Sequence, residues 1–275
     1  MANLIKPELF TSILGAKFTG AVKVLPLAVD LGEIEGFREV GETIHFPRFE
    51  ALSGLVTDMK TKAEMDTEKL SQKDSTAIIE HIGRAVAVED YEDLTALGNH
   101  IDEAGRQLGV VFARHLDSRL IAEAKKTLLI STPASANKIR ETELNDALGL
   151  FGDEQDSEDF AGIIINSKLL GAFYEMQGFV DKNKTFVTDG SGIIRNGLVG
   201  YFRNIPVIVS DKDTYDTSTK KCETLIIKKG SLGYKMKKEF NTEIQRNAKA
   251  KSSDICADAI FAVKLLNEEG IVLIK

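Results

Sequence analysis

Side chains that could do chemistry are sparse in this chain, and none stands in a catalytic or metal-binding pattern. The four histidines, His45, His81, His100 and His115, do not have the spacing of metal ligands. His100 and His115 are expected on one helix, but too far apart along it to chelate one ion. The HExxH and GxSxG signatures of zinc proteases and serine hydrolases do not occur. We therefore predict that the histidines are structural.

Three further segments have partial resemblance to binding motifs. Gly15 and Gly20 have the spacing of a phosphate-binding loop, but Ala21 stands where that loop needs a lysine. The segment 190–195, GSGIIR, lacks the third glycine of the dinucleotide-binding fingerprint and opens no expected helix. Asp211 and Asp213 could bind a metal, although two solvated turn aspartates are the simpler interpretation. The sequence thus predicts no enzyme, no catalytic or cofactor-binding residue, no metal ligand and no cofactor.

The composition is that of an ordinary globular chain of 275 residues, 43% hydrophobic and 28% charged, which excludes a disordered protein. With 35 lysines and arginines against 42 acids, the net charge of −7 gives no overall attraction to nucleic acid or anionic lipid. Cys222 and Cys256 are too few for a disulfide framework, and we predict that both are reduced and buried. The first eight residues lack a signal-peptide pattern and the apolar run 22–29 is too short to span a membrane, so the chain is expected in the cytoplasm.

The first third of the chain predicts extended structure. Residues 1–36 have scattered glycines and no sustained apolar period, which favours an extended arm rather than a helix. Residues 41–49, GETIHFPRF, predict a short edge strand because Pro47 cannot donate to a sheet ladder. A polar excursion over 53–75 and a second strand over 76–88 follow. The two strands predict an extended hairpin that needs a partner surface, because a two-stranded ribbon is marginal alone.

A long amphipathic helix is predicted over 89–129. Its apolar residues recur every three or four positions, acids stand near its start, and Lys125 and Lys126 near its end suit the helix dipole. A short helix is predicted over 141–150, and Ser167 is predicted to cap another that runs to Met176. Strands are expected at 160–166, 205–210, 224–228, 234–245, 253–266 and 271–274.

Charge is unevenly distributed along the chain. Residues 141–160 carry eight acids and no lysine or arginine, whereas residues 228–251 carry eight lysines and arginines against Glu239 and Glu243. Two solvated faces would explain this segregation. The alternative is that the two stretches are complementary surfaces of neighbouring copies, since opposite charges orient association.

The order of elements resembles the major capsid proteins of tailed bacteriophages, which have the Hong Kong 97-like (HK97-like) fold. The resemblance spans nearly the whole chain and is loose in each motif. The stretches that carry it are GETIHFPRF at 41–49, VAVEDYEDL at 86–94, IIINSKLLGAF at 163–173, GLVGYFRNIPVIVSD at 197–211 and FAVKLLNEEGIVLIK at 261–275.

This resemblance implies an α+β HK97-like capsid fold with an N-arm, an extended β-hairpin loop, a peripheral domain with a long spine helix, and an axial α/β domain. The implied segments are an N-arm over 1–36, an extended loop over 37–88, a peripheral domain over 89–137 and 225–275, and an axial domain over 138–224. The last strand, 271–275, is assignable to either domain.

The implied function is that of a major capsid protein of a tailed phage or prophage. Its copies would self-assemble as hexamers and pentamers into an icosahedral shell around double-stranded DNA, held without sequence-specific binding. Implied partners are a separately encoded scaffolding protein, because no scaffold-like extension precedes the arm, together with a portal and decoration proteins, and no membrane. Implied locations are the virion and, during assembly, the host cytoplasm. The alternative is an encapsulin-like nanocompartment shell that encloses cargo enzymes.

Overall fold

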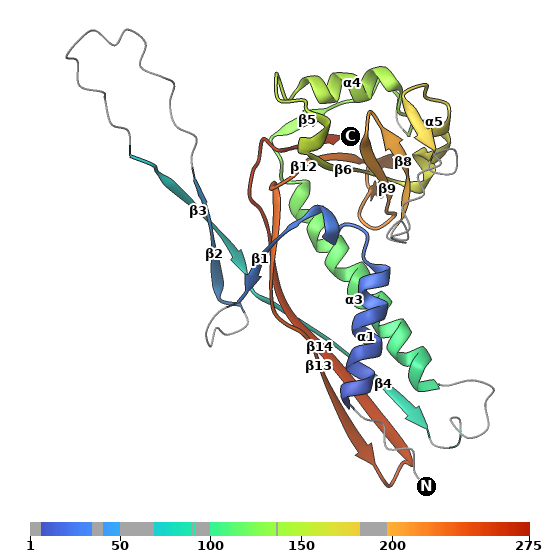
Figure 1. The fold of residues 1–275 in the computed structure, drawn as a ribbon. Helices are drawn as coiled ribbons and strands as arrows, with labels where there is room; N and C mark the ends of the chain where they lie inside the picture. Colours follow the sequence, from blue (N-terminus) through green and yellow to red (C-terminus); the bar gives the residue numbers. More distant parts are fainter. Residues whose placement is uncertain are drawn as a thin grey trace.

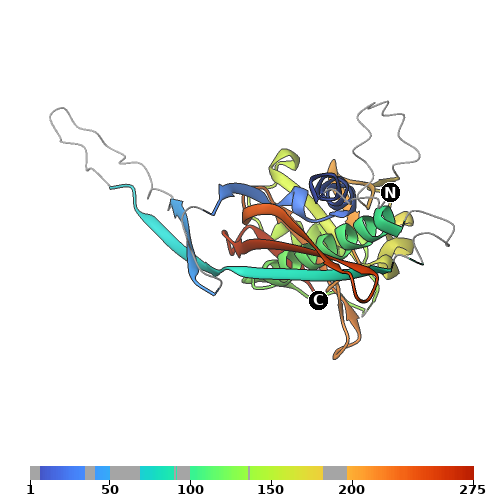
Figure 2. The same cartoon turned by 90° about the horizontal axis from the view of Figure 1, so that it is seen from below.

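The computed structural model describes residues 7–34, 41–49, 69–89, 91, 100–135, 137–181 and 197–275. These residues form an elongated body, with a long four-stranded sheet and its helices toward one end and a seven-stranded sheet with short helices at the other (Figure 1). A two-stranded ribbon leaves the body sideways (Figure 2). Within the described part of the chain, no helix is long and apolar enough to cross a membrane.

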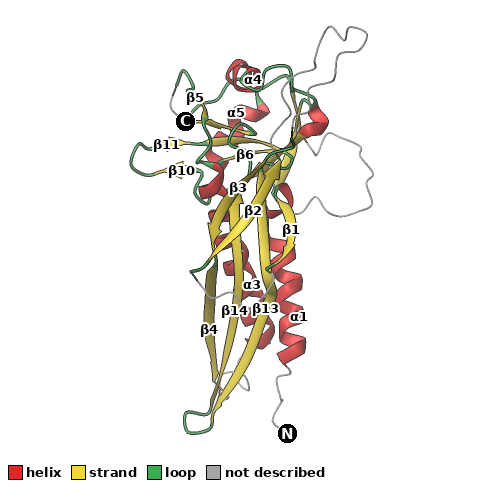
Figure 3. Cartoon of the chain, turned by 90° about the vertical axis from the view of Figure 1, so that its left-hand side faces the viewer, coloured by secondary structure: helices red, strands yellow, loops and turns green. Residues whose placement is uncertain are grey.

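The long sheet has the strand order β1-β13-β14-β4, formed by Val29–Glu33, Leu232–Asn247, Ser252–Leu265 and Glu80–Glu89. β13 and β14 form one long antiparallel hairpin that runs from the Leu232–Leu265 pair to the Asn247–Ser252 pair. The predicted alternation of β14 is confirmed, because every second residue from Ile255 to Leu265 is buried. Helix α1 (Pro7–Ala21) and the long spine helix α3 (His100–Ala124) pack on that buried face (Figure 3).

The N-terminal segment corrects one prediction, because Pro7–Ala21 form helix α1 rather than an extended arm. Phe10, Leu14 and Phe18 are buried at four-residue spacing and pack against the spine helix. That period was present in the sequence, but Gly15 and Gly20 obscured it, since glycine disfavours helices. The rest of the segment is extended as expected: a 3-10 turn, η1 (Leu25–Leu27), leads into β1.

The predicted long helix is α3, but its described range is His100–Ala124. Glu89 ends strand β4, and the helix stops five residues before position 129, where strand β5 (Leu129–Ser131) begins. The predicted start is wrong at Glu89, because this residue pairs with Ser252 in the long sheet. Tyr91 is helical, and positions 90 and 92–99 lie outside the described residues. Lys125 and Lys126 lie in the turn that follows the helix.

The seven-stranded sheet has the order β5-β15-β12-β6-β9-β8-β7. Four predicted strands are confirmed in it: β6 (Phe160–Ile165), β9 (Ile205–Val209), β12 (Thr224–Lys228) and β15 (Ile271–Ile274). Its other members are β5 and the antiparallel pair β7 (Phe179–Asp181) and β8 (Leu198–Phe202). Apolar side chains on its two faces belong to different cores, one shared with α1 and α3 and one with helices α4 (Glu141–Gly149) and α5 (Leu170–Tyr174).

Short helices cover the far face of this sheet. The predicted helix over 141–150 is α4, Glu141–Gly149. The helix predicted to run from Ser167 to Met176 is the 3-10 turn η3 (Ser167–Leu169) followed by α5 (Leu170–Tyr174). Its cap is Asn166 rather than Ser167, since the Asn166 side chain accepts a hydrogen bond from the Lys168 N–H. A second 3-10 turn, η2 (Ser157–Asp159), precedes β6.

The predicted hairpin exists as an antiparallel ribbon of β2 (Thr43–Phe49) and β3 (Gln72–Ile78). Its second strand starts earlier than predicted and ends at Ile78, after which β4 joins the long sheet at its edge. The excursion between them lies, at positions 50–68, outside the described residues. The structure thus gives the α+β architecture expected from the sequence.

Candidate assembly surfaces

Three of the four histidines have structural partners, and His100 is the first described residue of α3. His45 pairs with Asp74 across the ribbon, and His81 Nε2 lies 3.0 Å from Asp258 Oδ2 across β4 and β14. The His115 ring packs edge-on against Phe261, with centroids 6.1 Å apart. Among the residues that the structure describes, no three His, Cys, Asp or Glu side chains are placed to hold a metal ion.

The other candidate motifs also have structural positions. Gly15 and Gly20 lie within helix α1, and the segment 190–195 lies outside the described residues. Asp211 accepts a hydrogen bond from the Ser167 N–H at 2.8 Å, and Ser167 holds the pKa of this carboxyl below its usual range. Asp213 accepts from the Ser118 hydroxyl on α3. The two aspartates therefore anchor different elements.

The prediction for the cysteines is half correct. Cys222 is buried, and burial raises the pKa of its thiol, whereas Cys256 is exposed on the open face of the long sheet. Both are free thiols.

The ribbon has a small core of its own, which fixes its base on the long sheet. Phe46 is fully buried and packs with Ile44, Ile79 and Ala262, while the Lys235 ammonium lies 5.4 Å from the Phe46 ring centroid. Ile78, by contrast, is 61% exposed on the same ribbon. The base of the ribbon is thus held by its own subunit, and its outer face is open.

A cavity of about 340 Å³ lies between the ribbon and the turn that joins β14 to β15. Arg48 crosses it and donates to the Leu266 carbonyl oxygen at 3.2 Å. Two polar residues that line it already have partners: Asp74 pairs with His45, and the Ser75 hydroxyl donates to the Phe46 carbonyl oxygen. Its charged lining groups have mixed sign: Arg48 and Lys264 are basic, and Asp74, Glu268 and Glu269 are acidic.

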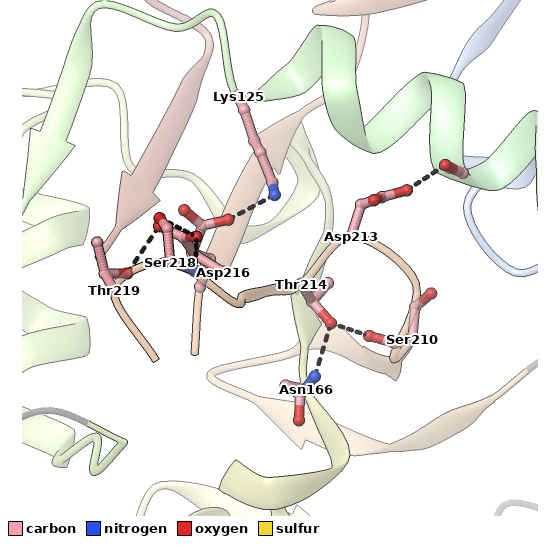
Figure 4. Close-up of polar contacts among 10 residues, drawn as sticks. Lys125, Asn166, Ser210, Asp213, Thr214, Asp216, Ser218 and Thr219 are labelled. Atoms are coloured by element: carbon pink, nitrogen blue, oxygen red, sulfur yellow. Dashed lines mark hydrogen bonds and ion pairs between the residues drawn. The ribbon is translucent and has the colours of Figure 1, made fainter. Parts of the chain in front are cut away.

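A hairpin of β10 (Tyr215–Asp216) and β11 (Lys221–Cys222) projects on the side of the molecule away from α1 (Figures 2 and 3). The Asp216 carboxylate closes its turn by accepting from Ser218 Oγ at 2.6 Å, the Ser218 N–H at 2.8 Å and Thr219 Oγ1 at 2.7 Å (Figure 4). These hydrogen bonds hold the pKa of Asp216 well below its usual range.

The base of this hairpin is braced from three elements. The Asn137 amide donates to the Lys220 carbonyl at 2.9 Å and accepts from the Cys222 N–H at 2.8 Å, as a neighbouring strand would. Asn166 Nδ2 donates to the buried Thr214 hydroxyl at 2.9 Å (Figure 4). Lys125, just after α3, pairs with Glu223 at 2.5 Å. The projecting β10–β11 hairpin is therefore held at its base by hydrogen bonds and an ion pair from other parts of the fold.

The acidic stretch 141–160 is partly used within the chain. Glu141 accepts from the N–H groups of Gln177 and Gly178, and Glu143 accepts from those of Ala134 and Arg140. Asp146 is exposed on α4, and the other exposed acids lie in and next to η2: Asp153, Glu154, Asp156, Glu158 and Asp159.

The start of the basic stretch 228–251 meets the acidic stretch: Lys228 Nζ lies 3.1 Å from Glu154 Oε2 and 4.8 Å from the Phe151 ring centroid, and the Lys229 N–H donates to the Asp159 carbonyl oxygen at 2.8 Å. Lys249 and Lys251 lie exposed at the turn between β13 and β14, at the opposite end of the molecule from α4 (Figure 1). The two surfaces therefore cannot neutralise each other along most of their length within one subunit.

Comparison with known proteins gives a consistent result. No family model matches the chain. The major capsid protein of Staphylococcus phage phiMR11 is 25% identical over 274 residues, which cover 99% of this chain and 94% of that protein.

Solved structures show the same fold at low identity. A structure from Microbacterium phage Oxtober96 matches with a TM-score of 0.61 and 14% identity over 100% of this chain and 94% of the other. The capsid of the native GTA particle matches with a TM-score of 0.66 and 12% identity over 94% and 90%. The virus-like particle from Pyrococcus furiosus matches with a TM-score of 0.60 and 14% identity over 98% of both chains. The HK97-like fold and the resemblance to phage major capsid proteins are thereby confirmed.

Proposed function

We propose that this chain is the major capsid protein of a tailed phage or prophage, and that its copies assemble as hexamers and pentamers into an icosahedral shell around double-stranded DNA. The observation that carries this proposal is similarity to a phage major capsid protein along 99% of the chain. The fold supports it, because capsid structures of the cyanophage P-SCSP1u and of bacteriophage PhiM1 match 92% and 94% of the chain. The role is structural rather than catalytic.

We also propose the corresponding division of the chain. Residues 1–36 would be the N-arm and 37–88 the extended loop, with the peripheral domain at 89–137 and 225–275 and the axial domain at 138–224. The long sheet with α1 and α3 supports a peripheral body, and the seven-stranded sheet supports an axial one. β12 and β15 are neighbouring interior strands of that second sheet, which favours placing 271–275 with the axial domain.

The proposed partners are other copies of this chain, a scaffolding protein, a portal and decoration proteins. Packaged DNA would be enclosed without sequence-specific contacts, which suits the net charge of −7, since tight binding needs phosphate neutralisation by lysine and arginine. The proposed location is the virion, after assembly in the host cytoplasm.

Electron microscopy of the purified protein, expressed alone and with scaffold candidates, tests this proposal. We expect closed shells or curved sheets, with mixed sizes and tubes when the chain is expressed alone. Light scattering that shows a monomer at high concentration, with and without these partners, would contradict it.

A nanocompartment shell that encloses cargo enzymes is the second candidate, because the virus-like particle from Pyrococcus furiosus shares the fold over 98% of both chains. The whole-length relative among phages favours the first. The contents of particles from the native host separate the two. Nuclease-protected double-stranded DNA supports the phage capsid, whereas a stoichiometric cargo protein without DNA supports the nanocompartment.

A further inference from the structure

The spine helix α3 carries one acidic residue inside the protein core. Asp117 is only 4% exposed and lies among Ala113, Leu116 and Leu120, all fully or almost fully buried. Its carboxylate faces the turn that follows α1. Oδ2 accepts from the Lys23 N–H at 2.9 Å, and Oδ1 accepts from the N–H groups of Val24 at 2.9 Å and Leu25 at 3.3 Å.

Three consecutive backbone donors thus converge on one side chain. An ionised carboxylate suits them because it offers acceptor positions on both oxygens, whereas an asparagine amide offers one oxygen and turns its NH₂ group toward a donor. Burial of an unpaired charge is costly, so these hydrogen bonds are what make an aspartate tolerable at a core position.

The same turn is attached on its other side to the seven-stranded sheet. Lys23 Nζ donates to the Val209 carbonyl at the end of β9, at 2.9 Å. Leu27 is buried so closely against β6 that a Cβ added at Gly162 would lie 3.0 Å from its Cδ2. The turn therefore lies between the spine helix and the second sheet and contacts both.

We propose that Asp117 is a positioning residue that clamps the turn 22–25 between the spine helix and the seven-stranded sheet, and thereby holds α1 on α3. In the absence of its carboxylate the turn 22–25 would open from α3 more often, while both sheets stay folded. The apolar contacts of α1 remain, but the N–H groups of residues 23–25, just after the helix, lose their acceptors.

Hydrogen exchange of the unassembled chain tests the clamp directly. In the wild type, the amides of Lys23, Val24 and Leu25 should exchange as slowly as those in the adjacent turn of α3. In Asp117→Asn they should exchange faster by about tenfold or more, while amides of β6 and β12 keep their wild-type rates. Trypsin cleavage after Lys17 and Lys23 should accelerate in parallel.

Two variants serve as matched controls. Lys23→Met removes the bond to Val209 but keeps all three N–H donors, so exchange at 24 and 25 should stay near wild type. Thr214→Val removes a buried hydroxyl from the hairpin base and should leave the turn 23–25 unchanged. The proposal is overturned if wild-type amides 23–25 exchange like exposed ones. It is also overturned if Asp117→Asn leaves them unchanged or accelerates β6 and β12 equally.

The consequence for assembly rests on the proposed function. We expect Asp117→Asn to give fewer closed particles than Thr214→Val under identical conditions. Wild-type chains that show the predicted exchange but never assemble would contradict the capsid function and leave the clamp supported.

Discussion

Gly109 of the spine helix lies directly against the backbone of Leu14 in α1. A Cβ added at position 109 would be 3.0 Å from the Leu14 carbonyl oxygen and 3.0 Å from the Phe18 nitrogen. Backbone atoms of a packed helix cannot move aside as a flexible side chain can, so this contact sets how close the two helices come. At Gly105, one turn earlier, an added Cβ would instead meet side chains, with Ile13 Cγ2 at 3.2 Å and Phe10 Cε2 at 3.4 Å.

We predict that Gly109→Ala destabilises the protein by about 1–3 kcal/mol, because the added methyl overpacks the helix contact. Gly15→Ala is the matched control. Gly15 is also a helical glycine, but nothing lies within 4 Å of its added Cβ, so alanine should be neutral or stabilise by up to about 1 kcal/mol. Urea unfolding measures both, and equal effects at the two positions would contradict this account of the contact.

A second prediction concerns the base of the ribbon. Phe46→Ala should cost about 3 kcal/mol or more locally, since Phe46 is fully buried in the small core that joins the ribbon to the sheet. Ile78→Ala removes a side chain that is 61% exposed on the same ribbon and should cost less than about 0.5 kcal/mol. Hydrogen exchange at Ile44 and Ala77 gives the readout. Retained protection in Phe46→Ala would show that the ribbon does not depend on this core.

The sequence was most informative where one periodicity dominated. The apolar run 160–165 is typical of a buried strand, and the alternation from Ile255 to Leu265 is typical of a strand with one buried face; both strands are present. Helix α1 was missed although Phe10, Leu14 and Phe18 have helical spacing, because two glycines lowered its helix propensity. Its stability comes from contact with α3, which is tertiary information.

The polar anchors were the harder part to predict. Asp117 falls on the apolar stripe of the helix, and a charge in that stripe was a signal that could have been recognised. Its partners could not, because three backbone N–H groups more than 90 residues away carry no side-chain pattern. Asn137, which braces the β10–β11 hairpin, was equally invisible, since its role depends on a position set by the fold.

The pKa values of two aspartates are shifted in opposite directions from the ordinary value. Burial raises the pKa of Asp117, so the folded chain binds this proton more readily than the unfolded chain. Its ionisation therefore costs stability at neutral pH, and that cost is relieved as the pH falls through the folded pKa. Ser167 lowers the pKa of Asp211, so its contribution is present above the unfolded pKa and is lost as the pH falls. Carbonyl-detected NMR titration should give midpoints above 3.8 for Asp117 and below it for Asp211, and the reverse order would contradict both assignments.

The segregated charges give a prediction about assembly. If the acidic stretch 141–160 of one copy meets a basic surface of another, assembly should slow as salt screens the contact, with a Debye length of about 8 Å at physiological ionic strength. Lys237→Glu with Lys238→Glu should slow assembly and leave folding intact, whereas Lys212→Glu, an exposed lysine outside the basic stretch, should have little effect. Light scattering measures the rates. Assembly rates that do not change with salt would contradict this contact and would indicate that both stretches are solvated faces.

The last prediction concerns the excursion between β2 and β3. The part of it from Thr57 to Leu70 has Met59, Ala63, Met65 and Leu70 as its apolar side chains, and Leu70 is 58% exposed. Burying a large side chain contributes about 1.5–3 kcal/mol, whereas ordering each backbone residue costs about 1–2 kcal/mol, so these few anchors cannot order the segment alone. In a shell, contacts with a neighbouring copy would supply the difference.

Replacement of residues 50–70 by a short Gly-Ser turn tests this, because it keeps the whole ladder from the Thr43–Ile78 pair to the Phe49–Gln72 pair. We expect a chain that folds with unchanged stability and no longer closes shells. A Gly-Ser replacement of Thr217–Thr219 in the other projecting hairpin is the control for loop removal in general. Hydrogen exchange of the full chain completes the test, with 57–70 protected in particles and open in free subunits. Equal protection in both states would mean that the excursion packs on its own subunit, and closure of shells by the shortened chain would remove its proposed role.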